Sequence, residues 1–208
     1  MIEVQDWGLI DYNEGWERQK KIAEEIIEKR NRNVFVVCQH PSVITVGRAG
    51  RAENILLPTK LLETKGIKIV YNDRGGDVTL HNPGQLVGYP IFNLYDYKTD
   101  LHWFLREIEQ LVIDLVGSFG IEAGRVDKMT GVWIEGRRKI CAIGLHCTRW
   151  VTSHGFALNV CNDLSEFNYI VPCGIKGKEV TSIEKELGTE IDFNIVKTRC
   201  IEFFEKRF

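Results

Sequence analysis

Apolar residues recur along this chain at helical spacing in some stretches and as short runs in others, so the pattern predicts both helices and strands. The first helix is expected to begin at Asp11, which with Glu14 resembles a capping box, and to run to about Arg30. A longer helix is expected from an N-cap at Asp100 to a stop at Gly120. The residues expected to face inward are Trp16, Ile22, Ala23, Ile26 and Ile27 in the first helix and Leu101, Phe104, Leu105, Ile108, Leu111, Val112, Leu115 and Val116 in the second.

Shorter elements lie between and after these helices. Residues 34–39 (VFVVCQ) and 42–47 (SVITVG) have the composition of buried strands. A short helix around Leu62 is expected to end at Gly66, and residues 67–72 (IKIVYN) then form a strand. The tail is expected to be a helix from about Asn194, with Ile195, Ile201 and Phe204 facing inward.

Three further strands are expected at residues 131–134, 139–147 and 151–160. The gaps between them are short, which predicts an antiparallel meander. Together with the helices, this order of elements predicts the α+β class, with a mixed, largely antiparallel sheet flanked by helices. The length and the absence of linker-like tracts predict a single domain over residues 1–208.

Composition and charge exclude several classes of function. The formal net charge is −2 with both signs mixed along the chain, which argues against nucleic acid as a partner. The amino terminus lacks a signal-peptide pattern and no apolar run is long enough to span a bilayer, so a soluble, cytoplasmic protein with no membrane partner is expected. The six cysteines are then expected to be free thiols, and their spacing does not predict a metal site.

Residues 74–91 (RGGDVTLHNPGQLVGYPI) concentrate glycines with polar side chains and read as a binding loop. Pro83 and Gly84 fit the central positions of a type II turn, which would join residues 78–81 and 86–91 as paired strands. The preceding glycine pair lets the backbone approach a ligand closely, with Arg74 and His81 at the two ends of the first strand. The alternative is a glycine-rich turn with solvated flanks.

Small residues are predicted to face one another on two neighbouring strands. Ala142 and Gly144 share one face of their strand, and Gly155 and Ala157 do likewise on the next. The space left beside them could hold either a crossing helix or a slender apolar chain.

Cys173 differs from the other cysteines because it lies between Pro172 and Gly174, in a turn that would present its side chain outward. Thiol chemistry requires a thiolate, and an ordinary thiol with a pKa of about 8.5 is only slightly ionised at neutral pH. Lys139 or His81 could supply the nearby cation. Lys139 opens an apolar strand, although Arg137 and Arg138 beside it also allow a plain solvated turn.

Residues 74–91, followed by GVW, KICAIGL, RWVTSHGFALNV, FNYIVPCGI and VTSI in one order, resemble the lipoyl(octanoyl) transferase family. The resemblance runs from GLIDY near the amino terminus to about residue 183. It implies a fold similar to the catalytic domains of biotin protein ligases and lipoate ligases. It also implies transfer of an octanoyl group from acyl carrier protein to a lysine of lipoyl domains, those of 2-oxoacid dehydrogenases and of the glycine cleavage H protein, without a cofactor.

The resemblance also assigns roles to residues. Cys173 would carry a thioester intermediate, and Lys139 would lower the pKa of that thiol and relay protons. His81 is a candidate second base or an orienting residue. The acyl-binding residues implied by the resemblance are Arg74, Gly75, Gly76, Asp77, Val78, Thr79, Leu80, His81, Ala142, Ile143, Gly144, Gly155, Phe156 and Ala157.

Two rival interpretations remain open. The first is an ATP-dependent lipoate or biotin ligase of the same fold, because residues 47–51 (GRAGR) are similar to a glycine-arginine adenylate loop. A nearby variation is a cysteine-dependent amidotransferase, which takes octanoate from one lipoyl domain to another and has its active cysteine in a different motif. The second rival is a binding module that recognises acylated carrier proteins without turning them over, and it predicts no covalent adduct.

Overall fold

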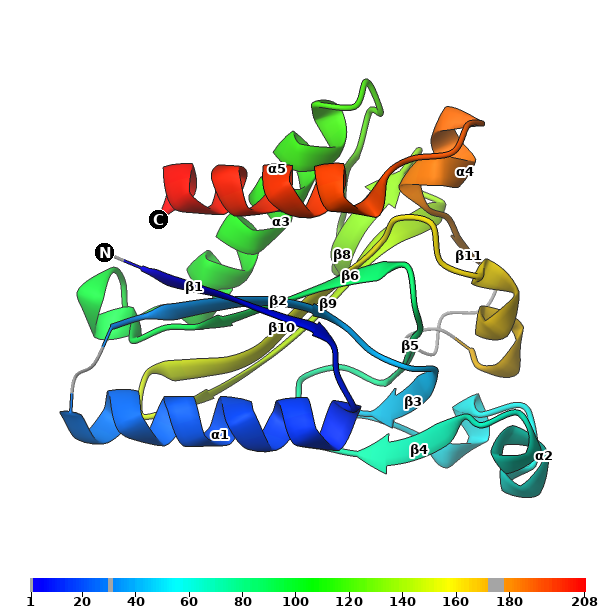
Figure 1. The fold of residues 1–208 in the computed structure, drawn as a ribbon, viewed down its shortest axis with the longest axis horizontal. Helices are drawn as coiled ribbons and strands as arrows, with labels where there is room; N and C mark the ends of the chain where they lie inside the picture. The colour runs from blue at the N-terminus through cyan, green and yellow to red at the C-terminus, as the bar shows by residue number, and fades with distance from the viewer. Residues whose placement is uncertain (1, 30–31, 172–177) are drawn as a thin grey trace.

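The protein, represented here by a computed structural model, consists of two sheets with helices around them, and the structure describes residues 2–29, 32–171 and 178–208 (Figure 1). The strands are β1 (Glu3–Leu9), β2 (Val34–Gln39), β3 (Val43–Val46), β4 (Lys68–Tyr71), β5 (Val78–His81), β6 (Gln85–Ile91), β7 (Gly124–Val126), β8 (Met129–Ile134), β9 (Arg138–Thr148), β10 (Val151–Asn159) and β11 (Glu179–Val180). The α-helices are α1 (Tyr12–Lys29), α2 (Thr59–Thr64), α3 (Leu101–Gly117), α4 (Ile183–Leu187) and α5 (Phe193–Arg207), with 3-10 turns at η1 (Ala52–Asn54), η2 (Leu94–Asp96) and η3 (Leu164–Tyr169).

The large sheet has the strand order β1-β2-β6-β10-β9-β8-β7, and β11 pairs beside β9. Its pairs are antiparallel except for β1 with β2 and β11 with β9. The small sheet has the order β4-β3-β5. The predicted α+β fold with a mixed, largely antiparallel sheet is therefore confirmed, and so is the meander of β8, β9 and β10.

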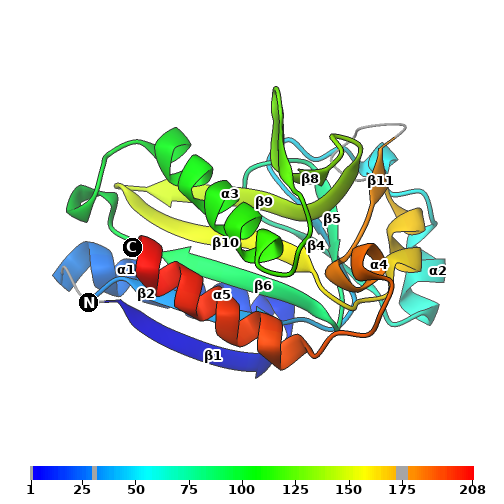
Figure 2. The ribbon, with the colours of Figure 1, turned by 90° about the horizontal axis from the view of Figure 1, so that it is seen from above.

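The helices cover both faces of the large sheet (Figures 1 and 2). Helices α3 and α5 pack on one face, where they enclose the main core with residues of β2, β6, β8, β9 and β10. Helix α1 lies on the opposite face and packs against β2, β6 and β10, and the small sheet lies beyond its amino-terminal end. The small sheet has a core of its own, shared with α2 and η3.

The starts of α1 and α3 and the end of α2 follow the predicted caps, whereas α3 ends at Gly117 and not at the predicted Gly120. The Asp11 carboxylate accepts a hydrogen bond from the Asn13 backbone N–H at 2.9 Å, and α1 begins at Tyr12, directly after Asp11. Asp100 accepts from the Trp103 N–H at 2.9 Å at the start of α3. Gly66 follows α2 with a φ of +74°, as expected for a residue that ends a helix.

The predicted pairing of residues 78–81 with 86–91 is wrong. The turn itself is of the expected kind: the Gln85 N–H donates to the Asn82 carbonyl, and Gly84 has a φ of +87°. However, β5 pairs with β3 in the small sheet, whereas β6 pairs with β2 and β10 in the large sheet. A type II turn does not match the twist of a two-stranded hairpin, so here it carries the chain from one sheet to the other.

Two further expectations are corrected. Strand β1 has no counterpart in the prediction, because at the edge of the sheet none of its residues is buried and its sequence lacks the apolar run of a core strand. In α5, Phe204 is buried as predicted, but Ile195 is 49% exposed, and Val196 and Cys200 face the core in its place. The helix begins at Phe193 after a cap at Asp192, and its buried residues recur every four positions, as expected for one face of a helix.

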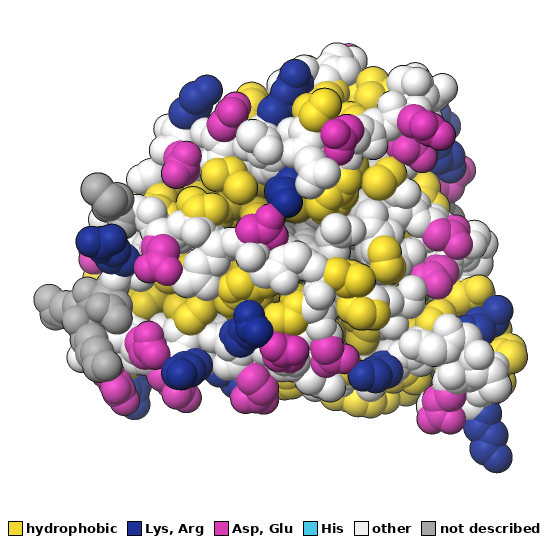
Figure 3. All heavy atoms as spheres, viewed as in Figure 1, with side chains coloured by type: hydrophobic (Ala, Val, Ile, Leu, Met, Phe, Trp, Pro, Cys, Tyr) yellow, Lys and Arg dark blue, Asp and Glu magenta, His cyan; other side chains and the backbone are white. Residues whose placement is uncertain are grey.

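Acidic and basic side chains are interspersed over the face shown in Figure 3, which agrees with the mixed charge of the sequence. Within the described ranges, no helix combines the length and apolar character needed to cross a bilayer. The described cysteines are free thiols; Cys38, Cys141 and Cys200 are buried, whereas Cys161 is only partly so.

Candidate active site

A narrow cavity, the slot, lies where the small residues of β9 and β10 meet the loop before β5. Ala142 pairs with Ala157 and Gly144 pairs with Gly155 across the two strands, as the period of two predicts. The slot has a volume of about 50 Å³. Its walls are Tyr12, Arg74, Gly76, Asp77, Thr79, His81, Val87, Tyr89, Ala142, Ile143, Gly144, His154, Gly155, Phe156 and Ala157.

Most of the residues implied for acyl binding therefore line the slot. The exceptions on β5 follow from the alternation of side chains along a strand. Thr79 and His81 point from β5 into the slot. Val78 and Leu80 alternate with them, and they are fully buried in the core of the small sheet. Val78 and Leu80 are therefore not among the walls of the slot.

Neighbouring backbone, and not a crossing helix, makes the nearest contact with two of the small residues. A Cβ atom added at Gly144 would lie 2.5 Å from the Gly75 carbonyl oxygen, because the loop before β5 crosses β9 there. The Gly75 N–H also donates to the Leu145 carbonyl at 2.9 Å. A Cβ atom at Gly155 would collide with the Gly88 carbonyl of β6. The open part of the slot thus lies beside Ala142 and Ala157.

Arg74 holds this loop in place. Its guanidinium donates to the Thr45 carbonyl at 2.7 Å, to the Thr45 hydroxyl and to the Asp77 carbonyl at 2.7 Å. The side chain is 7% exposed, and it joins β3 to the segment that covers Gly144. Arg74 therefore shapes the wall of the slot through the loop.

A second loop, residues 47–51, packs against the first and uses its own backbone donors to do so. The N–H groups of Gly47, Arg48 and Ala49 donate to carbonyls of residues 74–77 at 3.0–3.1 Å. The Gly50 N–H donates to the Gly47 carbonyl, and the Arg51 N–H donates to the Asp77 carboxylate. All five consecutive N–H groups are therefore engaged within the protein.

His81 is a buried wall residue of the slot and has a defined tautomer. Its Nδ1 is 2.8 Å from Gln85 Oε1. The Gln85 amide nitrogen donates to the Leu80 carbonyl and to Asn159, so its oxygen must accept, and Nδ1 of His81 carries the proton. Burial foremost, and then the charge that His40 would carry, lower the pKa of His81 to about 3. His81 is neutral at pH 7.

Aromatic and polar residues that sequence reasoning did not identify surround His81. The ring of Tyr12 stacks on it at 5.6 Å between centroids, and His40 lies edge-on at 5.8 Å. His40 bonds the Ile10 carbonyl and the Tyr89 hydroxyl, both at 2.7 Å, and burial lowers its pKa to about 4. These contacts join segments that are distant in the sequence, so no local sequence pattern predicts them.

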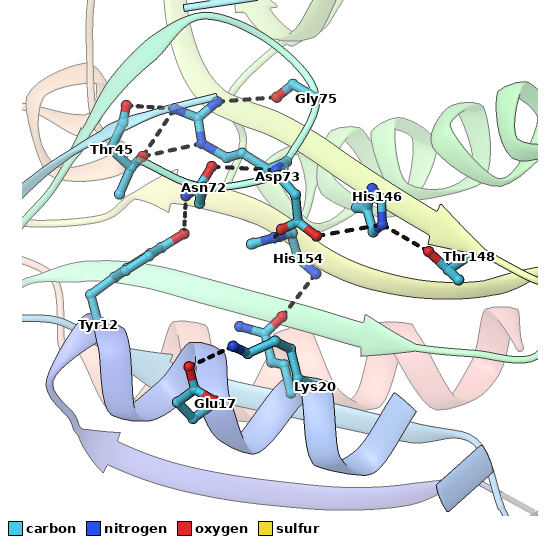
Figure 4. A network of polar contacts seen from close by, with 12 residues as sticks. Tyr12, Glu17, Lys20, Thr45, Asn72, Asp73, Gly75, His146, Thr148 and His154 are labelled. Carbon is cyan, nitrogen blue, oxygen red and sulfur yellow. Dashed lines mark hydrogen bonds and ion pairs between the residues drawn. The ribbon is translucent and has the colours of Figure 1, made fainter. Parts of the chain in front are cut away.

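A polar network continues from the slot along β9 and β10 (Figure 4). His154 is buried, has a φ of +57°, and its Nε2 lies 2.8 Å from an Asp73 carboxylate oxygen. The hydrogen bond from His154 is the main cause that lowers the pKa of Asp73 to about 2. His146 contacts the other Asp73 oxygen at 3.4 Å. The network fixes the residue that precedes Arg74.

Lys139 lies at the junction between the slot and a larger groove. The groove, with a volume of about 970 Å³, is lined by Arg51, Asn54, Leu56, Gly75, Gly76, Asp77, Leu101, His102, Leu105, Lys128, Lys139, Ile143, Gly144 and Val171, among others. Gly76, Asp77, Ile143 and Gly144 line both the groove and the slot. A small cavity lined by Lys139 also shares Thr79, Ala142 and Ala157 with the slot.

The register of β9 against β8 places Lys139 on the face of the sheet that borders the slot. Val132 of β8 pairs with Cys141, but the next residue, Trp133, pairs with Lys139, so Ile140 is an extra residue in β9. Without this bulge, Lys139 would share the face of Cys141, which points into the main core. With the bulge, it shares the face of Ala142.

Cys173 lies outside the described residues. The chain on either side of residues 172–177 runs close to Lys139: Val171 lines the groove with it, and Val180 of β11 pairs with it. The Thr181 N–H donates to the Lys139 carbonyl at 3.0 Å. Among the described residues, no group of three His, Cys, Asp or Glu side chains is arranged to hold a metal ion.

Solved structures of lipoylating and biotinylating enzymes share this fold. A bipartite lipoate protein ligase of Thermoplasma acidophilum aligns with a TM-score of 0.74 and 15% identity, over 99% of this chain and 82% of that one. A biotin protein ligase of Aquifex aeolicus aligns with a TM-score of 0.58 and 12% identity, over 99% of this chain and 69% of that one. The fold expected from the sequence is thus confirmed.

Sequence comparison is more specific. The model of the lipoyl protein ligase A/B catalytic domain matches residues 11–205. An octanoyltransferase of Cytophaga hutchinsonii is 46% identical over 225 aligned positions, covering 100% of this chain and 92% of that protein. An octanoyltransferase of Solibacter usitatus is 49% identical over 201 positions, covering 97% and 90%. The chain therefore belongs to the octanoyltransferase family of acyltransferase enzymes, within the lipoyl protein ligase A/B catalytic-domain fold.

Proposed function

We propose that residues 1–208 form one catalytic domain that moves an octanoyl or lipoyl group from acyl carrier protein to a lysine of lipoyl domains through a thioester on Cys173. The observation that carries the proposal is the place of Lys139, at the point where an open groove meets a slot of small residues. The groove is the expected path of the carrier's arm, and the slot is the expected place of the acyl chain.

The position of the flanking chain supports Cys173 as the nucleophile. Val171, which lines the groove with Lys139, is two residues from Cys173, and two residues of chain span at most about 7 Å. An ammonium ion near a thiol favours the thiolate, and one unit of pKa depression corresponds to about 1.4 kcal/mol. Lys139 is therefore the proposed partner of the Cys173 thiolate.

The chemistry then divides into two transfers. The Cys173 thiolate attacks the carbonyl carbon of the donor thioester, a new C–S bond forms, and the carrier's thiolate leaves and takes a proton from Lys139. The neutral amine of the acceptor lysine next attacks the acyl-enzyme, loses a proton to Lys139, and expels the Cys173 thiolate. The first step exchanges one thioester for another and the second forms an amide, so the cycle requires no ATP and no cofactor.

Among the proposed acyl-binding residues, Ala142 and Ala157 would contact the chain most directly, because backbone already lies against Gly144 and Gly155. Burial of apolar chain contributes about 0.8 kcal/mol per CH₂, which is enough to favour one chain length. A neutral His81 with a pKa of about 3 is a weak base, which favours a role in orienting the thioester over proton abstraction.

The geometry argues against the ATP-dependent rival. A phosphate-binding loop presents free backbone N–H groups to the anion, whereas the N–H groups of residues 47–51 all donate within the protein. The proposed acceptors are the lipoyl domains of 2-oxoacid dehydrogenases and the glycine cleavage H protein. The T. acidophilum ligase of the same fold was studied with its E2 lipoyl domain, which is consistent with such an acceptor.

The test is a transfer assay with octanoyl-acyl carrier protein and a lipoyl domain, with and without ATP. Octanoylated lipoyl domain should form at the same rate in both, and Cys173→Ser and Lys139→Ala should each reduce the rate by at least about a hundredfold. A strict requirement for ATP would favour the ligase. Binding of the octanoylated carrier without turnover would favour the binding module.

A further inference from the structure

The residue across the strand pair from Lys139 is Trp133, and the two side chains are in contact. Lys139 Nζ lies 4.6 Å from the centroid of the Trp133 ring, over its face. Both residues are buried, at 6% and 2% exposure. An ammonium ion over an indole face is attracted by the negative electrostatic potential of the π electrons on that face, and the attraction is strongest where water is excluded.

The pairing depends on the bulge at Ile140, which places Trp133 directly opposite Lys139. The lysine stem then passes over Gly131, where an added Cβ atom would lie 3.4 Å from Lys139 Cε and only 2.5 Å from the Cys141 carbonyl. Gly131 also has a φ of +119°, which side chains rarely adopt. A larger residue at position 131 would displace the lysine stem or the strand.

A buried carboxylate on α3 anchors this part of β8. Glu109 is fully buried, accepts from the Gly131 N–H at 3.0 Å, and pairs with Arg106 and Arg125 at 2.6 and 2.9 Å. The strand that carries Trp133 is thereby tied to the helix behind it. A second lysine, Lys178, lies farther from the same ring, at 5.7 Å, and donates to the Gly136 carbonyl.

We propose that Trp133 is a positioning residue for the acyl transfer: its indole face holds the Lys139 ammonium at the junction of groove and slot, where it stabilises the Cys173 thiolate. This inference rests on the proposed roles of Lys139 and Cys173. A buried ammonium needs compensation for lost hydration, and the ring contributes to it without offering an acceptor that would take the proton. The ring also blocks one side of the lysine and so restricts its rotamers.

The test measures the rate of iodoacetamide alkylation at Cys173 against pH, by mass of the peptide that contains it. Replacing tryptophan with fluorinated tryptophan keeps the shape of the ring, but the fluorine atoms withdraw electron density and weaken the negative potential of the ring face. The midpoint of the profile should rise by about half a unit to one unit, and Trp133→Leu should raise it at least as much. Trp133→Phe, which keeps a weaker ring face, should fall between Trp133→Leu and the unchanged protein.

Controls separate this inference from the proposed function. In Trp133→Phe protein, the other four tryptophans can still be fluorinated. Fluorination of this variant should not move the midpoint of the alkylation profile any further. Trp103→Phe, on α3, should leave the profile unchanged. On a Lys139→Ala background, fluorination should have no further effect. A profile that moves with Lys139→Ala but not with fluorination or Trp133→Leu would overturn the role of Trp133 alone, whereas a profile unmoved by Lys139→Ala would overturn the proposed function itself.

Discussion

At the scale of single residues, the site depends on the small side chains that β9 and β10 place beside the slot. Gly144 and Gly155 admit neighbouring backbone, and Ala142 and Ala157 leave the space that remains. The sequence indicated this small-residue face by its period of two. It could not indicate that a loop from residues 74–76 would occupy part of it, because that contact joins segments about seventy residues apart.

A larger side chain in the slot should therefore change the choice of acyl chain. With Ala142→Val, kcat/KM for an octanoyl donor should fall by about tenfold or more, because the branched side chain takes space proposed for two or three methylene groups. A butanoyl donor should lose much less. Transfer assays with both donors check this, with Ala52→Val on the exposed η1 as the control; equal losses for both donors would contradict the assignment of the slot.

At the scale of elements, two departures from regular geometry shape the site. The type II turn at Pro83 and Gly84 sends β5 and β6 into different sheets, and the bulge at Ile140 turns Lys139 toward Ala142. Local sequence predicted the turn type and the strands. It could not predict the partner of each strand or the extra residue in β9, since pairing is decided by contacts with distant strands.

The two loops over the slot should depend on Asp77. Its carboxylate accepts from the N–H groups of Arg51 and Val78 and from the Asn54 amide at 2.6 Å. Asp77→Ala should destabilise the paired loops by about 1–3 kcal/mol, and it should speed amide hydrogen exchange across residues 47–54. The exposed Glu53→Ala on the same segment is the matched control. Unchanged exchange in Asp77→Ala would show that the loops are held by other contacts.

At the scale of the whole molecule, buried neutral histidines should make stability depend on pH. Burial lowers the pKa of His40 to about 4 and that of His81 to about 3, below the ordinary value of about 6.5 in the unfolded chain. The unfolded state therefore binds more protons between these values, and stability falls as the pH falls below about 6.5. Each histidine should cost about 2 kcal/mol between pH 7 and pH 5.

Denaturant unfolding at pH 7 and pH 5 measures this loss. His81→Gln, which keeps a hydrogen-bonding side chain but does not titrate, should lose about 2 kcal/mol less than the unchanged protein over that interval. If His81→Gln and the unchanged protein lose stability equally, His81 is not buried in its neutral form.

The arrangement of the whole molecule was predictable where the sequence carried strong periodicity or a family resemblance, as in α1, α3 and the meander. It was not predictable at the edge strand β1 or in the cluster of Tyr12, His40 and Tyr89, whose roles come from packing between distant segments. The chemistry assigned to Cys173 and Lys139 remains the central proposal.

The most direct test of that proposal is the intact mass of the protein after incubation with octanoyl-acyl carrier protein alone. We predict the addition of one octanoyl group, located on Cys173 by peptide mass, removed by hydroxylamine as expected for a thioester, and absent in Cys173→Ser. An octanoyl adduct that persists in Cys173→Ser, or octanoyl transfer by that variant at the rate of the unchanged protein, would contradict the account.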